Sequence, residues 1–309
     1  MQAIWQDIYR ILGLRGDLGD EALRFAGTWA LKSRPNRIIS QEDAAAELTQ
    51  AAGTTLKGIA GIGEHLKAVV KAVHEIDNNV RLRAVTRIAQ ARFVATAILF
   101  RSFEPAVQAD LLRKWERVTF RIYGLGGADS RYKVGDYVRL GYDILANNIG
   151  PEEIGGSLTA LSKGYTMDDL ILGSDCWLYC YDGWQEELRY LLFRYDKFLS
   201  KISGEKLNAG QWNKVWSEDP ARSIEHILPQ SSGADYVYHL GNLTMLPPNL
   251  NSSLKDKPRG EKAGTYLKCG LKATVAVGKQ IENGTAWDLS AIEARAADVE
   301  AFVRKEWAN

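Results

Sequence analysis

Apolar residues recur at helical spacing through most of the first half of the chain. Two stripes of this kind consist of Trp5, Ile8, Ile11 and Leu12, and of Leu66, Val69, Val70 and Val73. Side chains three and four residues apart lie on one face of an α-helix, and Pro35 and Pro105 break the pattern between predicted helices. The pattern therefore predicts an all-α scaffold or linker domain over residues 1–164.

The hydrophobic pattern changes from about residue 165. A helix with a packing stripe is predicted over residues 184–199, and a terminal helix is predicted to begin at Asp288 or Ser290. Between them, we expect a strand that carries Glu225 and His226 and a second strand over residues 243–246. We therefore expect a mainly α (α+β) fold, in which a C-terminal helical domain over residues 165–309 carries a small ββα element.

The composition excludes several classes of protein. The chain has 309 residues, 46% of them hydrophobic, and a net charge of +1, so any nucleic-acid surface must be a local patch. Three cysteines do not suit a disulfide framework, which favours a reducing cytoplasm, and no histidine near Cys176 and Cys180 supports a zinc site. We expect no membrane association, because no apolar run is long enough for a transmembrane helix or a signal peptide.

A set of polar residues in fixed order carries the candidate chemistry. Glu225 and His226 are adjacent and Pro229 follows them, while Asn242 and Asn251 come later in the chain. A Glu-His pair alone is usually a surface or packing feature. The whole order at this spacing is that of an HNH, or ββα-metal, nuclease site.

The residue types suit phosphodiester hydrolysis. Histidine is the side chain whose ordinary pKa suits activation of water, so we assign His226 as the general base. Glu225 and Asn251 offer the oxygen ligands that Mg²⁺ or Mn²⁺ prefers, and Asn242, after a glycine in a turn, is expected to brace the loop under the histidine. Side chains alternate along a strand, so Glu225 and His226 meet at one spot only if the strand twists or ends there.

The chain turns basic after Asn251. We expect Lys255, Lys257, Arg259 and Lys262 to bind the DNA backbone, since lysine and arginine supply most non-specific affinity for phosphate. A solvated face without a ligand is the alternative. Four more cations in a helix predicted over residues 80–103 are expected to pair with acids of neighbouring helices rather than with phosphate, namely Arg81, Arg83, Arg87 and Arg92.

The sequence resembles a known family in its second half. The matching segments are residues 188–195, 223–230, 240–244 and 250–252, with Lys257-Pro258, Lys262 and Tyr266 after them. They resemble the C-terminal HNH domain of the GmrSD-type, modification-dependent restriction endonucleases and of the SspE-like anti-phage nucleases. The resemblance implies metal-dependent DNA cleavage with His226 as the base. Asp256 and Arg259 depart from the family's usual residues, and Asp256 could join or perturb the metal shell.

The same resemblance bears on partners and on the reaction. The family's N-terminal nucleotide-hydrolysing sensor domain has no counterpart in this sequence, so we expect either a fragment or a separate partner chain. A single catalytic centre predicts nicking, with double-strand cleavage by a dimer as the other possibility. Two alternatives stay open: a degenerate HNH domain that binds DNA or a partner without cutting, and an RNA nuclease.

Overall fold

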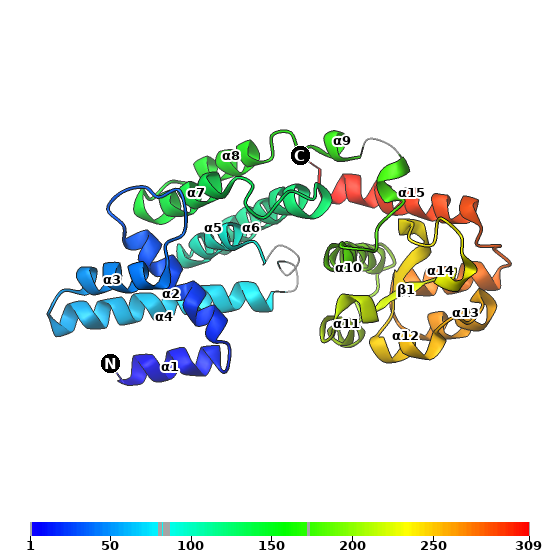
Figure 1. Ribbon diagram of the computed structural model, residues 1–309, viewed down its shortest axis with the longest axis horizontal. Helices are drawn as coiled ribbons and strands as arrows, with labels where there is room; N and C mark the ends of the chain where they lie inside the picture. The colour runs from blue at the N-terminus through cyan, green and yellow to red at the C-terminus, as the bar shows by residue number, and fades with distance from the viewer. Residues whose placement is uncertain (1, 80–81, 83–86, 172–173, 309) are drawn as a thin grey trace. The chain divides into compact units, whose positions relative to one another are not determined.

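A computed structural model describes residues 2–79, 82, 87–171 and 174–308. The chain divides into two compact units, residues 1–166 and 167–308, which we describe separately. Both are mainly helical, as predicted, and the described residues form a single two-stranded sheet, which lies in the second unit (Figure 1). No described helix combines the length and the apolar character that a bilayer span requires.

The first unit is built from helices alone in its described part. Their bounds are α1 (Gln2–Leu12), α2 (Gly16–Ala30), α3 (Gln41–Ala52), α4 (Leu56–Asn78), α5 (Ala89–Phe100), α6 (Pro105–Thr119), the π-helical turn η2 (Phe120–Leu125), α7 (Val134–Ala146) and α8 (Pro151–Leu161). Figure 1 shows α2, α3 and α4 beside one another, in agreement with their mutual contacts. Helix α5 is buried from Gln90 to Leu99, so it forms the centre of this unit.

Of the four arginines expected to pair with acids of neighbouring helices, Arg92 does so. Arg92 is buried, and its Nε lies 2.7 Å from Oε1 of Glu21. Its guanidinium also lies 3.6 Å from Asp77, so this cation pairs with acids of α2 and α4. Arg81 and Arg83 lie outside the described residues, and within the range 80–103 predicted as one helix the described helix α5 runs from Ala89 to Phe100.

The second unit surrounds the short sheet with helices. Its elements are α9 (Met167–Leu170), η3 (Ser174–Trp177), α10 (Gln185–Ile202), α11 (Ala209–Trp216), η4 (Pro220–Arg222), β1 (Ile224–His226), η5 (Gln230–Ser232), η6 (Leu240–Asn242), β2 (Leu243–Met245), α12 (Pro248–Leu254), α13 (Arg259–Lys268), α14 (Lys272–Glu282) and α15 (Leu289–Glu306). The helix predicted to begin at Asp288 or Ser290 does begin there: the Asp288 carboxylate caps α15 by accepting from the Ala291 N–H at 3.1 Å. The order β1, β2, α12 is the expected ββα element.

Strand β2 packs on α10 and α14, which fixes one face of the sheet against the core. The strands are antiparallel, with Ile224 opposite Met245, Glu225 opposite Thr244 and His226 opposite Leu243. All six residues are buried. The sheet therefore holds the candidate catalytic segment in the interior of the unit rather than on a free loop.

Candidate functional site

Glu225 and His226 lie on opposite faces of the short sheet. Thr244, the cross-strand partner of Glu225, bonds to the Thr274 hydroxyl of α14 at 2.8 Å, and Glu225 itself bonds to side chains of α13. His226 instead contacts Tyr181 and Tyr238. This is the alternation that a regular strand imposes, and no twist brings the two side chains to one spot.

The imidazole of His226 sits between aromatic rings. Its centroid lies 4.8 Å from that of Tyr181 and 5.7 Å from that of Tyr238, both edge to face, and Nε2 lies 3.1 Å from the amide nitrogen of Gln230. Burial and then the charge of Lys262 lower the pKa of His226 to about 4. The ring is therefore neutral near pH 7, which is the form that can accept a proton.

Asn242 is fully buried and holds the loop that follows the histidine. Its Oδ1 accepts from the Leu228 N–H at 2.8 Å, and its Nδ2 donates to the carbonyls of Leu228 and Val237 at 3.0 and 2.8 Å. The indole of Trp287 donates to the same Oδ1 at 3.3 Å. The side chain thus ties the segment after β1 to the segment before β2.

Asn251 lies in α12 and reaches back to the segment that enters β1. Its Nδ2 donates to the carbonyl oxygens of Arg222 and Ile224, each at 3.0 Å. Both N–H groups of the amide are used in this way, so the amide orientation is fixed and Oδ1 faces away from these carbonyls. Oδ1 is accordingly the atom through which Asn251 would bind a hard cation.

Glu225, which was expected to ligate a metal, is paired with a lysine and a tyrosine of α13. Its Oε1 lies 2.7 Å from Nζ of Lys262 and accepts from the Tyr266 hydroxyl at 2.6 Å. Burial raises the pKa of this carboxyl, while the neighbouring ammonium opposes that rise. A divalent cation at Glu225 would have to displace or face the Lys262 ammonium.

Lys262, which was expected to bind the DNA backbone, does not reach the surface. Its side chain is 1% exposed, and Nζ donates to the carbonyl oxygen of His226 at 2.7 Å in addition to pairing with Glu225. A buried ammonium with two acceptors cannot contact a DNA phosphate. Lys255, Lys257 and Arg259 are exposed, as a DNA surface requires, and so is Asp256.

The side chains of the candidate site supply only part of the ligands that a divalent cation needs. Within the described part of the chain, no three His, Cys, Asp or Glu residues come together as a metal site. Asn251 supplies one amide oxygen, and Glu225 is committed to Lys262. Because Mg²⁺ usually keeps waters and binds substrate phosphates beside one or two protein ligands, the site would be completed by the substrate rather than by the protein.

The residues that surround the histidine and its loop were given no role at the site from the sequence. Gln230 lies within the conspicuous motif, and its position four residues after His226 was an available signal. Tyr181 and Tyr238 stack on each other with centroids 5.6 Å apart and carry no local signal, since only the fold brings them to His226. Arg295 of α15 donates to the carbonyls of Leu240, Gly241 and Leu243, which secures the same loop from the far end of the chain.

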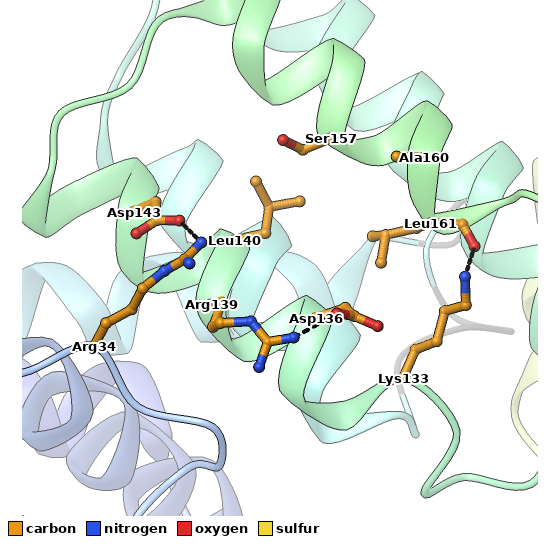
Figure 2. Close-up of a pocket in the computed structure, with 9 residues that line it drawn as sticks. All are labelled: Arg34, Lys133, Asp136, Arg139, Leu140, Asp143, Ser157, Ala160 and Leu161. Atoms are coloured by element: carbon orange, nitrogen blue, oxygen red, sulfur yellow. Dashed lines mark hydrogen bonds and ion pairs between the residues drawn. The ribbon is translucent and has the colours of Figure 1, made fainter.

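A pocket in the first unit is not lined by a set of side chains comparable to those around His226. The cavity has a volume of about 290 Å³. It is lined mainly by residues of α7 and α8 (Figure 2). Each of its three cations already has an acceptor: Arg34 pairs with Asp143, Arg139 with Asp136, and Lys133 with the Leu161 carbonyl. The functional candidate is therefore the ββα element of the second unit.

The comparisons with known proteins agree with this location. Residues 175–299 match the family described as GmrSD restriction endonucleases, C-terminal domain. Comparison with curated proteins and with solved structures gives no significant match. The matched range contains both strands, His226, both asparagines and the Lys262–Glu225 pair. Residues 175–299 therefore belong to the C-terminal domain family of the GmrSD restriction endonucleases, which are nucleases of restriction systems.

Proposed function

We propose that this chain is a DNA endonuclease of a modification-dependent restriction or anti-phage defence system, acting in the cytoplasm. The observation that carries the proposal is a neutral histidine on a ββα element, within the range that matches the restriction-endonuclease family. His226 accepts a proton from the attacking water. Asn242 keeps the loop beyond the histidine in one conformation through its four side-chain hydrogen bonds.

Binding of the substrate favours the proton transfer. A pKa of about 4 makes the free imidazole a weak base. The negative charge of a bound phosphodiester favours the imidazolium, so it raises this pKa when the water is attacked. Lys255, Lys257 and Arg259 would hold the DNA backbone, because they are exposed and follow directly on α12.

The cation is a separate part of the proposal. Mg²⁺ or Mn²⁺, when bound, would stabilise the charge of the phosphorane and of the leaving oxygen. Asn251 Oδ1 is the protein ligand that supports it, while Glu225 is left out. We therefore expect weak metal binding without DNA, and cutting of one strand at a time by a single chain.

The decisive experiment is cleavage of supercoiled plasmid with Mg²⁺, Mn²⁺ or EDTA. Wild type is compared with His226→Ala and with His74→Gln, a control histidine on α4 of the first unit. We expect metal-dependent nicking that is lost in His226→Ala and retained in His74→Gln. Equal cleavage by His226→Ala would exclude the general-base role.

Two further arms separate the alternatives. Cleavage of RNA in preference to DNA would assign an RNA nuclease. Metal-independent DNA binding without any nicking would favour the non-cutting HNH domain, for which the Glu225–Lys262 pair is the structural argument.

Replacement of Lys257 and Arg259 by alanine should weaken DNA binding for all sequences and reduce its salt dependence, with gel shifts at several salt concentrations as the measurement.

A further inference from the structure

The outer edge of β1 has carbonyl groups that no strand satisfies. The bonds from Leu246 N–H to the Ser223 carbonyl, at 2.8 Å, and from Ile227 N–H to the Asn242 carbonyl, at 3.0 Å, set the phase of the ladder. Hydrogen-bonded and non-hydrogen-bonded pairs alternate in an antiparallel ladder. Ile224 and His226 are therefore in non-hydrogen-bonded positions, with their carbonyls directed away from β2, and the described chain has no third strand on that side.

Two side chains take the place of a third strand. Asn251 donates to the Ile224 carbonyl at 3.0 Å, and Lys262 donates to the His226 carbonyl at 2.7 Å. Both donors come from the helices that follow β2, namely α12 and α13. The backbone of the proposed catalytic histidine is thus fixed on its open edge by a lysine.

The lysine is itself held by buried partners. Its Nζ lies 2.7 Å from Oε1 of Glu225, and that oxygen accepts from the Tyr266 hydroxyl at 2.6 Å. Lys262 is 1% exposed, Glu225 5% and Tyr266 0%. The contacts form a chain in which Tyr266 donates to Glu225, Glu225 pairs with Lys262, and Lys262 donates to the backbone of His226.

Stability alone does not account for this arrangement. A buried ion pair loses about as much from desolvation as it gains from attraction, so well-packed apolar side chains would serve the core equally well. An apolar side chain would leave the buried His226 carbonyl without a donor. The specific property of the ammonium is that it satisfies this carbonyl and the Glu225 carboxylate together.

We propose that Lys262 is a positioning residue for His226, with Glu225 and Tyr266 fixing its ammonium. The inference deepens the proposed function, because it takes His226 as the base. It also gives Glu225 a role that competes with metal ligation: the carboxylate orients the lysine. A displacement of the histidine backbone by a fraction of an ångström moves the imidazole relative to the water it activates.

The test uses the full-length double variant Glu225→Gln, Lys262→Met. It removes both charges together, so no uncompensated charge stays buried, and the amide oxygen of the introduced glutamine can still accept from Tyr266. Thr274→Val is the matched control, because its hydroxyl bonds to Thr244 on the same face of the sheet without contacting His226. Tyr266→Phe removes the contact furthest from the histidine and should have the smaller effect.

We expect the double variant to remain folded and kcat for plasmid nicking to fall by about 10- to 100-fold, with KM nearly unchanged. Thr274→Val should keep the wild-type kcat. A folded double variant with wild-type kcat would overturn the proposal. A rise of more than about tenfold in the half-saturating Mg²⁺ concentration would overturn it too, because Glu225 would then act as a metal ligand.

A second measurement keeps this inference separate from the proposed function. The imidazole signals of His226 are followed by NMR without DNA or metal. We expect one sharp set of signals in wild type and in Thr274→Val, and broadened or multiple sets in the double variant. Unchanged signals would contradict the positioning role. If wild type cuts no nucleic acid, the proposed function fails, while this readout still decides whether Lys262 fixes the histidine.

Discussion

Two features of its surroundings lower the pKa of His226. Burial between Tyr181 and Tyr238 removes water from the ring, and Lys262 places a positive charge behind the same residue. Both effects disfavour the imidazolium, and they lower the pKa to about 4. The residue is therefore neutral near pH 7, and the proposed function requires the negative charge of the substrate to make it an effective base.

This pKa predicts how folding stability depends on pH. The unfolded chain binds a proton at His226 below about pH 6.5, while the folded chain does so only below about pH 4. Between these values the unfolded state holds more protons, so stability falls as pH falls, by about 3 kcal/mol at most. Urea unfolding at pH values from 7.5 to 4.5 should show this loss in wild type and a smaller loss in His226→Gln. Parallel curves for the two proteins would contradict the burial of a neutral histidine.

At the scale of elements, the site depends on close contact between the loop before β2 and helix α15. Gly241 lies in η6, and a Cβ built on it would come within 1.8 Å of the Ile292 carbonyl oxygen. Arg295 donates from the same helix to the Gly241 carbonyl at 2.8 Å. The loop that carries Asn242 can approach α15 only because residue 241 has no side chain.

Gly241→Ala should therefore destabilise the second unit. The methyl group must push the loop and α15 apart, which disturbs the Arg295 bonds, and we expect a loss of about 2–4 kcal/mol. Gly264→Ala on α13 is the control, since a Cβ there meets no atom within 4 Å and alanine is the better helix former. Thermal unfolding measures both variants. A stable Gly241→Ala protein would show that the loop can move away from α15 at low cost.

Local signals explain which elements could be predicted. Both strands were expected near their observed positions, and an aspartate followed by an apolar stripe indicated the start of α15. The bracing contacts of Asn242 follow from its place in a turn after a glycine. These features depend on residues near one another in sequence, so the sequence pattern contains them.

The orientation of Glu225 and Lys262 could not be predicted from local patterns. Counting charges after Asn251 suggested one basic surface, but α13 turns Lys262 and Tyr266, four residues apart, toward the core together with Ala263. The four-residue spacing could have indicated this, because a lysine four residues from a buried aromatic residue lies on the same, packed face of the helix. The partner of the lysine, 37 positions earlier in the chain, is supplied by the tertiary fold alone.

At the scale of the whole molecule, every contact described for the site comes from the second unit. The residues that surround, brace or position His226 lie between Tyr181 and Arg295, inside residues 167–308. The family match over residues 175–299 lies in the same range. The second unit also has its own aromatic core, which includes Trp287 and Trp307. We therefore expect the second unit to contain all that phosphodiester cleavage requires.

A fragment of residues 167–309 tests this expectation. It should unfold in one cooperative transition and nick plasmid with a kcat close to that of the full chain, because its core and its site are complete. Its KM for DNA shows separately whether the first unit adds affinity, since a binding contribution from α1–α8 would raise KM in the fragment and leave kcat unchanged. The control is the same fragment with His226→Ala, which should fold and not cut. A folded fragment that binds DNA without cutting, beside an active full chain, would mean that the first unit takes part in catalysis and that the site is incomplete without it.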